Sequence, residues 1–593
     1  MSRSARLVPS STQPRRAKAA RGFLMRLRVG LWSGLSFGFE VVIVLMLALG
    51  ASLAQAQVRI PSVPDSGQLL RETQPPNPQA APSSNLPLNI QQQNASPSGS
   101  TETFPVRSIE ISGNTLIPTD TLHALVASGE GKNLTLDDLD ALADRITQAY
   151  HAHGYPLDRA YVPAQTLHDG VVRVAVLEAK YGAVTLHNDS AVSDRPLNAT
   201  LAPLQPGQQV SEFMLERSLL LMSDIPGAVV NSVLGPGAAA GTSDLNVDVT
   251  SAQRYTGVAS VDDYGNRYTD RVRVGGDFDI NGLFHQGDVL DLSALTSGHD
   301  MTYGRAGYRY LLNGQGTTVE AAISGLEYHL GNGLSNLEAH GTAVVESINL
   351  SQPLIRNTAY NLYGQVEYDH RQLHDDIDIV SVENNRHTGS WTGTLAGDQR
   401  DRTGITNMSV STTYGHVWFD DALAEFIDSI GPHTQGSYTK YDLSISRLQQ
   451  LNTTNALYFA LLGQFANRNL DTSEQFYLGG PTTVRGYDVG ALSGAQGNLA
   501  TAEFRHDFSI PVLPGPWQAA LFVDSGHLEV YKTTFVTGPN SFRLSSIGVG
   551  LHWSAPHAWV MNLSLATPLG AAPDAAGIDS SKVRFWAQLQ KGF

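Results

Sequence analysis

Cysteine is absent from the 593 residues, and charged residues make up only 16% of them. Without cysteine the chain has no disulfide framework, no thiol nucleophile and no cysteine-ligated metal site. The charged fraction is well below the roughly 25% that is usual in soluble domains. After residue 56, no stretch reaches the ~18 consecutive apolar residues that a membrane-spanning helix needs. A mature protein that spans a membrane must therefore do so as a β-barrel.

Glycine is abundant, with 56 residues, while hydrophobic residues make up 41% of the chain. Low charge and high glycine suit a β-barrel, in which apolar and polar faces alternate along each strand. Residues 1–56 hold eight of the 39 Lys and Arg residues and one acid, which leaves 31 basic against 54 acidic residues in the remainder. Such an acidic protein is a poor binder of nucleic acid, because it repels phosphates.

Residues 1–56 have the features of a secretory signal peptide. Basic residues precede an apolar run at 41–49, and Ala54-Gln55-Ala56 forms a small-residue cleavage signal. The run is too short to span ~30 Å of hydrocarbon, so we expect cleavage after Ala56 rather than a membrane anchor. Met1 and Met25 both remain possible start codons. A G-x-S-x-G match at 34–38 does not follow a strand and is interpreted as chance.

Residues 57–103 are predicted to form a plug helix and a linker. Pro, Gln, Ser and Asn dominate residues 75–100, which predicts an extended and mobile linker. Before it, residues 64–72 predict a short helix capped by Asp65 or Ser66. A helix of fewer than ~12 residues is marginal alone, so it needs a docking site elsewhere in the protein.

Residues 104–252 are predicted to form two small α/β modules, at 104–181 and 182–252. The first has a strand at 106–111, helices at 118–127 and from Thr135, and strands at 160–165 and 171–177 joined by Asp169-Gly170. The second repeats this order less clearly, with strands near 183–186, 228–234 and 245–250 and a helix at 211–222. Modules this small leave little room for an enzyme pocket. Their free sheet edges, however, can accept an extended segment of another chain.

Residues 253–593 are predicted to form a transmembrane β-barrel. About 16 alternating segments start near residues 255, 271, 287, 301, 316, 341, 358, 388, 403, 436, 453, 498, 517, 541, 557 and 582. This gives about 21 residues per strand and connection, which accommodates the ~9–11 residues of a membrane-spanning strand. An even number of antiparallel strands fits a single-chain outer-membrane barrel. A soluble β-sandwich, the alternative, favours fewer and shorter strands and more charge.

One connection of the predicted barrel, about 468–497, is unusually long and contains Arg485 between glycines. Asp524 follows one hairpin later, on the strand face that it shares with Phe522. If the loop folds back into the lumen, Arg485 is expected to meet Asp524 in a bidentate ion pair.

Three stretches resemble motifs of one family of outer-membrane proteins. Residues 478–487 read LGGPTTVRGY, residues 523–526 read VDSG, and residues 153–170 carry HGYP, VPAQ and LHDG. Together they resemble the two-partner secretion transporters (TpsB), the FhaC/ShlB/HecB-type haemolysin secretion and activation proteins. That family shares a superfamily with the barrel-assembly proteins. The resemblance covers essentially all of 57–593.

The resemblance implies a mainly β fold: a 16-stranded antiparallel barrel preceded by two POTRA domains, with a plug helix near 64–74 and an Arg–Asp contact that holds the long loop inside. The site residues that it implies are Gly479, Gly480, Thr483, Val484, Arg485, Gly486 and Tyr487 in the lumenal loop, Asp524 and Gly526 opposite them, Gln68, Leu69 and Leu70 in the plug, and Phe593 as the barrel signal. Lys591 departs from the usual pattern of that last strand.

The implied function is secretion in the outer membrane of a Gram-negative bacterium. POTRA domains in the periplasm bind a large unfolded exoprotein, which passes through the barrel and is in some systems activated there. Further expected partners are outer-membrane lipid and, during biogenesis, periplasmic chaperones and the barrel-assembly machinery. No enzyme activity, cofactor, metal or nucleic acid is expected. The alternatives are a barrel-assembly protein, which usually carries more POTRA domains, and a passive porin or barrel enzyme.

Overall fold

The computed structural model describes residues 63–73, 86–90, 102–570, 578 and 583–593. The predicted signal peptide, its cleavage site and most of the predicted linker lie outside the described residues. None of the helices in the described ranges is both long enough and apolar enough to cross a membrane.

The first α/β module builds a three-stranded sheet in the order β3-β6-β5, from Ser108–Ser112, Val171–Leu177 and Arg159–Tyr161. Helices α3 (Thr119–Val126) and α4 (Leu136–Ala152) pack on it, and Thr135 starts α4 with the predicted capping box. Asp169 and Gly170 both adopt positive φ angles, as the predicted hairpin turn requires. The strand predicted at 106–111 is in fact two: β2 (Thr103–Val106), which pairs with β4 (Lys132–Thr135), and β3.

The second module has a four-stranded sheet in the order β1-β8-β9-β7. Its strands are Leu88–Ile90, Ala228–Pro236, Thr242–Ser251 and Lys180–Asp189, and its helices are α5 (Asp194–Leu201) and α6 (Glu212–Ser223). Helix α5 was not expected from the sequence. The prediction of an unstructured linker is wrong at residues 88–90, because this segment forms a strand along β8.

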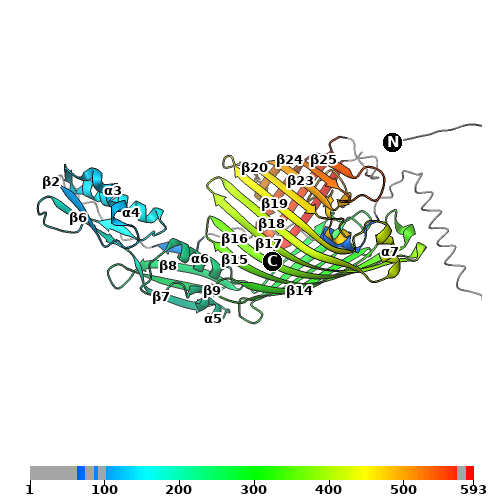
Figure 1. The fold of residues 1–593 in the computed structure, drawn as a ribbon, viewed down its shortest axis with the longest axis horizontal. Coiled ribbons are helices and arrows are strands. Elements are labelled where there is room, and N and C mark those ends of the chain that lie inside the picture. Colours follow the sequence, from blue (N-terminus) through cyan, green and yellow to red (C-terminus); the bar gives the residue numbers. More distant parts are fainter. Residues whose placement is uncertain (1–62, 74–85, 91–101, 571–577, 579–582) are drawn as a thin grey trace, which may run out of the picture. The chain divides into compact units, whose positions relative to one another are not determined.

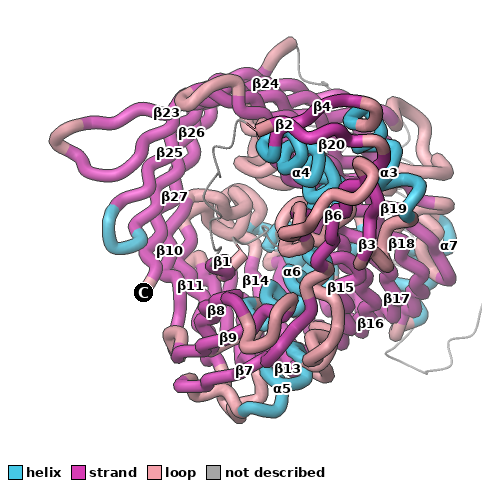
Figure 2. The backbone as a smooth tube through the Cα atoms, turned by 90° about the vertical axis from the view of Figure 1, so that its left-hand side faces the viewer, coloured by secondary structure: helices cyan, strands magenta, loops and turns pink. Residues whose placement is uncertain are grey.

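The barrel is closed and has 16 antiparallel strands, with β10 pairing to β27. These two strands lie side by side in Figure 2. Every predicted segment starts within about six residues of an observed strand. The strands are β10 (Tyr255–Asp262), β11 (Arg273–Asn281), β12 (Val289–Thr296), β13 (Met301–Leu311), β14 (Thr318–His329), β15 (Ala339–Arg356), β16 (Tyr360–Ile377), β17 (Val382–Asp401), β18 (Gly404–Phe419), β19 (Gly436–Gln450), β20 (Asn455–Ala466), β23 (Gln496–Ile510), β24 (Leu513–Glu529), β25 (Ser541–Ala555), β26 (Trp559–Pro568) and β27 (Arg584–Gly592).

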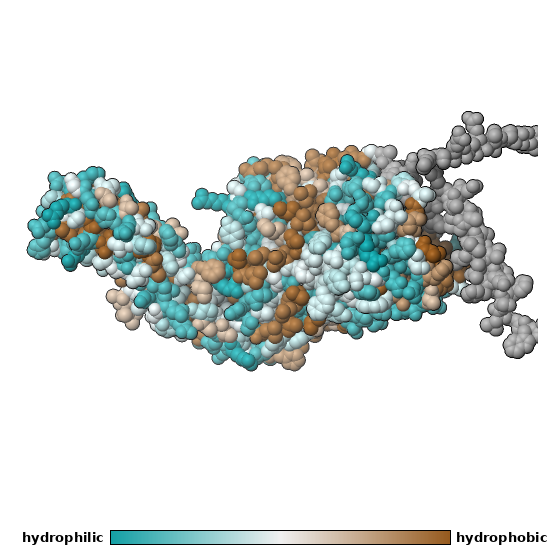
Figure 3. Space-filling view, in the orientation of Figure 1, coloured by the Kyte–Doolittle hydropathy of each residue, from teal (hydrophilic) through white to brown (hydrophobic). Residues whose placement is uncertain are grey.

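Side chains alternate between the two faces of the barrel wall. On β18, Met408 and Val410 are about half exposed on the outside, whereas Ser409 and Ser411 are buried on the lumenal side. Apolar side chains gather over the middle of the barrel strands (Figure 3), as a lipid-facing band requires. Strand β17 has 20 residues, more than the ~9–11 that cross a bilayer. The helix α7 (Ala422–Ile430) connects β18 and β19.

Two segments pack against the inner wall of the barrel. One is α2 (Ser66–Thr73), whose leucines join a cluster with wall residues of β14, β15 and β16. The other is the long loop between β20 and β23, which contains the turn η4 (Thr472–Glu474) and a small hairpin of β21 (Phe476–Leu478) and β22 (Leu492–Gly494). The candidate site is therefore the interior of the barrel rather than a pocket on its surface.

Candidate functional site

The tip of the lumenal loop is a compact turn built on two glycines. Gly479 and Gly480 have φ angles of +104° and +105°, a conformation that side-chain-bearing residues rarely adopt. The Thr483 hydroxyl accepts a hydrogen bond from the Gly479 N–H and donates one to the Gly479 carbonyl, both at 2.9 Å. These bonds fix the turn that presents Arg485 to the barrel wall.

Arg485 meets Asp524 in the bidentate contact expected from the sequence. Its Nε lies 3.0 Å from one carboxylate oxygen of Asp524, and its Nη2 lies 2.7 Å from the other. The backbone N–H of Arg485 also donates to this carboxylate, at 3.2 Å. The Asp524 side chain is fully buried on β24. It accepts further bonds from the hydroxyls of Ser546 (3.0 Å) and Thr501 (3.1 Å), so both its oxygens are satisfied.

Three partners of Arg485 were missed by the sequence reasoning. Its Nη1 pairs with Glu503 of β23 at 2.8 Å, and its guanidinium carbon lies 3.3 Å from the ring centre of Phe522. The indole N–H of Trp586 donates to the Arg485 carbonyl at 2.8 Å. Glu503 and Phe522 are direct cross-strand neighbours. Both could therefore have been identified as partners of Arg485 if the register between β23 and β24 had been known.

Apolar packing holds the same loop. Val484 and Tyr487 are buried in a cluster with Leu478 and wall leucines of β23, β24 and β25. A Cβ on Gly526 would lie 2.6 Å from a methyl carbon of Leu478, so the wall lacks a side chain where the loop presses against it. A Cβ on Gly486 would lie 2.7 Å from the Cβ of Ser546.

Asp488, also missed by the sequence reasoning, is a second ionic anchor of the loop. One of its oxygens lies 2.5 Å from Nη2 of Arg271, and the other lies 2.8 Å from Nη2 of Arg584 on β27. A third arginine, Arg267, lies 3.6 Å away. The loop is thus tied to β27, one of the two strands at which the barrel closes, and to the connection between β10 and β11.

Asp65 directly precedes the α2 helix, and its carboxylate accepts the Gln68 N–H at 2.9 Å. Leu69 and Leu70 are each about 1% exposed because they pack against wall residues such as Tyr328. The amide of Gln68 donates to Glu72 at 2.8 Å within the helix. The three residues predicted from the sequence therefore all lie in the buried first turns of α2. Leu69 and Leu70 pack against the barrel wall, and Gln68 lies beside the Glu72 carboxylate of the same helix.

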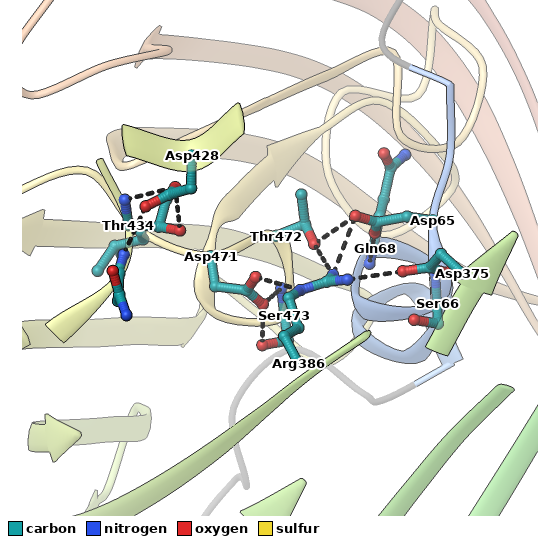
Figure 4. Close-up of polar contacts among 12 residues, drawn as sticks. Asp65, Ser66, Gln68, Asp375, Arg386, Asp428, Thr434, Asp471, Thr472 and Ser473 are labelled. Atoms are coloured by element: carbon teal, nitrogen blue, oxygen red, sulfur yellow. Dashed lines mark hydrogen bonds and ion pairs between the residues drawn. The ribbon is translucent and has the colours of Figure 1, made fainter. Parts of the chain in front are cut away.

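Arg386 of β17 joins the helix, the wall and the loop (Figure 4). Its Nη2 lies 3.1 Å from Asp65 before α2, its Nη1 lies 2.6 Å from Asp375 of β16, and its Nε lies 2.6 Å from Asp471 of the loop. Thr472 adds a hydrogen bond from its hydroxyl to Asp65, at 2.8 Å. Arg386 itself is 2% exposed. Nothing in the local sequence around Arg386 indicated this role, because its partners come from three distant segments.

Glu474, just after Thr472, provides another buried ion pair inside the barrel. Its carboxylate lies 2.7 Å from Nζ of Lys440 and also contacts Arg371 of β16. Its carbonyl accepts a bond from Gln464 at 3.0 Å. The loop is therefore attached by ion pairs near its start, at Asp471 and Glu474, and around its tip, at Arg485 and Asp488.

The two α/β modules meet at the buried carboxylate of Asp158. It accepts the Ala179 N–H at 2.8 Å and the side-chain amide of Gln209 at 3.2 Å, so it links the first module to the second. Burial raises the pKa of Asp158 to about 6.

Phe593 completes β27 at the seam of the barrel. Its N–H donates to the Gly257 carbonyl at 3.0 Å, and its ring stacks on Phe278 with a centroid distance of 6.4 Å. Lys591, the unexpected residue of this strand, lies 5.8 Å from the Trp559 ring and donates to a backbone carbonyl.

Within the described ranges, no three His, Asp or Glu side chains converge as a metal site would need.

Comparisons with known proteins identify similar chains and folds. The family model of the haemolysin secretion/activation proteins ShlB/FhaC/HecB matches residues 241–553, and a model of the ShlB-type POTRA domain matches residues 104–179. The "Heme/hemopexin transporter protein HuxB" of Haemophilus influenzae (strain 86-028NP) is 30% identical over 93% of this chain and 99% of its own length. The "Outer membrane transporter CdiB" of Dickeya dadantii (strain 3937) is 23% identical over 72% of this chain and 77% of its own. The solved structure of CdiB from Escherichia coli shares the fold, with a TM-score of 0.68 and 20% identity over 95% of this chain and 100% of its own.

Proposed function

Because the chain belongs to the haemolysin secretion/activation family ShlB/FhaC/HecB, we propose that α2 and the lumenal loop are the movable parts of its transport pathway. The protein is an outer-membrane β-barrel transporter of two-partner secretion, and it secretes a partner exoprotein. The observation that supports the proposal is the buried set of ion pairs around Arg386 and Arg485, which attaches both segments to the wall without covalent bonds.

The passenger first binds the two α/β modules in the periplasm. Their sheets have edges that can pair with an extended chain, and their cores are packed with apolar side chains. The passenger is unfolded at this point, because a folded domain does not fit a lumen already lined by side chains. Purified residues 104–252 should bind the unfolded N-terminal region of the cognate exoprotein. A fragment that folds but shows no binding counts heavily against this step.

Release of α2 then opens the lumen. The helix has eight residues, too few to be stable alone, so it gains its order from the wall and the loop. No P-loop occurs in the sequence, and the passenger's folding outside the cell biases the direction of transport. The protein needs no cofactor and catalyses no bond formation in this scheme.

Other partners act on the barrel itself. The outward apolar band meets outer-membrane lipid. During biogenesis, periplasmic chaperones deliver the chain, and the barrel-assembly machinery recognises the last strand with Phe593. Replacing Phe593 with Ala tests this step. The amount of protein inserted in the outer membrane should fall, although none of the residues inside the lumen is changed.

A further inference from the structure

The helix α7 lies at the extracellular end of the barrel. The α/β modules are periplasmic in this family, and the second of them leads directly into β10. Strand β10 therefore runs outward, and so does every second strand after it. Because β18 is the ninth strand of the barrel and β24 is the thirteenth, the connections that follow them are both extracellular.

The α7 helix carries its apolar side chains on the face that points away from the protein. Four of them share one helix face at the i, i+3, i+4, i+7 spacing: Leu423, Phe426, Ile427 and Ile430. All four are exposed, Phe426 to 58% and Ile430 to 66%. The residues that the helix buries are instead Ala424 and Asp428. A surface helix normally has the opposite arrangement, with its apolar face toward the core.

Polar contacts at both ends of α7 fix this orientation. One oxygen of Asp421 accepts the Ala424 N–H at 2.7 Å, and the other accepts the Asn385 N–H of β17 at 3.2 Å. The buried carboxylate of Asp428 accepts the N–H and the hydroxyl of Thr434, both at 2.7 Å (Figure 4). A roll of the helix that buried its apolar face would break these bonds. The face therefore stays exposed unless another molecule covers it.

The connection between β24 and β25 adds two apolar residues to this surface. Phe535 and Val536 are both exposed. A Cβ on Gly431, the residue just after α7, would lie 3.8 Å from a ring carbon of Phe535, so the connection and the helix are neighbours. Together they form the α7 patch, which consists of Leu423, Phe426, Ile427, Ile430, Phe535 and Val536.

The α7 patch lies beside the start of the lumenal loop. Asn469, which follows β20, donates one hydrogen bond to the Pro432 carbonyl at 2.6 Å and another to the Thr533 carbonyl at 2.9 Å. Its side chain therefore joins both parts of the patch to the loop that enters the barrel. A passenger that leaves the lumen along this loop emerges next to the patch.

Lipid is a poor occupant of the α7 patch. In Figure 3 the patch lies at the outer end of the barrel, and hydrophilic surface separates it from the apolar band over the middle of the strands. Residues 419–432 contain four acidic residues and no Lys or Arg. A helix that lies on an anionic membrane surface is instead rich in Lys and Arg.

A second copy of this chain is also a poor occupant. Stable protein interfaces bury about 1,200–2,000 Å² in total. The α7 helix has nine residues and is only about 14 Å long. A surface of this size is too small for a stable dimer, but it suits a short segment of another chain.

We propose that the α7 patch is a docking surface for an apolar segment of the passenger as it leaves the barrel. An unfolded chain arrives outside without a core, so its apolar side chains face water until more of the chain has emerged. The patch covers such side chains, and the bound segment in turn covers the patch. The inference rests on the proposed passage through the lumen, since it names the surface that the passenger meets at the exit.

The test uses the full-length protein in cells. The cognate exoprotein is arrested in transit by a tightly folded domain fused to its C-terminus, so that part of it has emerged. A photo-crosslinking amino acid is placed at Phe426 in the α7 patch or at Glu425, which is exposed on another side of the same helix. The proposal predicts at least fivefold more passenger adducts from position 426 than from position 425.

A variant of the patch provides the second measurement, with the crosslinker at Val536. Phe426→Ser/Ile430→Ser should lower the yield of passenger adducts from position 536 at least threefold. Both side chains are exposed, so the substitutions leave the fold intact. The matched control is Val272→Ser/Leu569→Ser, which replaces two exposed apolar residues on the extracellular connections after β10 and β26 and should leave the yield unchanged.

A crosslinker at Ser409, on the lumenal side of β18, separates the inference from the proposed function. Passenger adducts from position 409 with none from 426, or with equal yields from 425 and 426, overturn the inference and leave the proposed function intact. So do adducts from 426 with lipid or a second copy alone, and an equal effect of the two double variants. The absence of passenger adducts from 409 while transit is arrested overturns the proposed passage itself.

Discussion

Arg485 and Phe522 lie together on the lumenal side of β24, with the guanidinium carbon of Arg485 3.3 Å from the centre of the Phe522 ring. The ring covers one face of the guanidinium, while the edge of the same group carries the bonds to Asp524 and Glu503. A planar cation suits this arrangement, because stacking and bidentate bonding use different sides of it. Lysine offers neither the plane nor the two parallel bonds.

Arg485→Ala should abolish or strongly reduce secretion while the barrel still inserts. The change leaves Asp524 buried without its cation, and breaking such a pair costs about 3–5 kcal/mol. Arg485→Lys should rescue little of the activity. Secreted passenger and the heat-modifiable migration of the barrel are measured together. Normal secretion by Arg485→Ala from a correctly inserted barrel contradicts this role of Arg485.

Asp524→Ala should also impair secretion, but less than Arg485→Ala, because Glu503 still pairs with Arg485. The double variant Arg485→Ala/Asp524→Ala should be no worse than Arg485→Ala, since the attachment is lost only once. Strictly additive defects would show that the two residues act independently.

Phe522→Leu should lower secretion moderately by removing the ring and keeping an apolar side chain. A cation–π contact is worth about 0.5–2 kcal/mol, less than the buried ion pair. Phe504→Leu is the matched control, because Phe504 is 42% exposed on the neighbouring strand β23. Equal defects in the two variants would assign the effect to barrel stability rather than to Arg485.

Arg386→Gln should loosen α2 and raise single-channel conductance in planar bilayers toward that of a variant lacking residues 57–75. The substitution leaves Asp65, Asp375 and Asp471 facing one another without the shared cation. Arg447→Gln is the control, because it removes a partly exposed pair with Asp401 on the wall. If the 57–75 deletion leaves the conductance unchanged, α2 is not the plug.

The stability of residues 104–252 should depend on pH through Asp158. Its pKa is raised to about 6 in the folded protein, whereas an aspartate in an unfolded chain has a pKa of about 3.9. Protonated Asp158 favours the folded state, so this contribution is complete below about pH 4 and is lost as pH rises through 6. Asp158→Asn should therefore reduce the gain in melting temperature between pH 7.5 and pH 5, whereas the control Asp169→Asn, at an exposed position of the hairpin turn, should not. An identical pH profile for both variants contradicts the assignment.

Strand periodicity predicted the number of barrel strands and the strand face that Asp524 shares with Phe522. The contact of Asp524 with Arg485 was expected from the family resemblance, on the condition that the long loop folds back into the lumen. These features depend on alternation along one strand and on a single loop. The ion pairs of Arg386 and Asp488 could not be predicted, because each collects partners from segments far apart in the sequence. Strand β1 was missed for a related reason: the Pro- and Gln-rich composition around it suggests disorder, and only the exposed edge of β8 gives Leu88–Ile90 a partner.

The most direct test of the central claim is to locate a stalled passenger inside the barrel. A photo-crosslinking amino acid is placed at Ser409, on the lumenal side of β18, or at Met408, its neighbour on the outer face. Secretion of the cognate exoprotein is then arrested by a tightly folded domain fused to its C-terminus. The account predicts passenger adducts from position 409 and none from position 408. Adducts from 408 alone, or none from 409 while secretion is demonstrably arrested in transit, would contradict passage through the lumen.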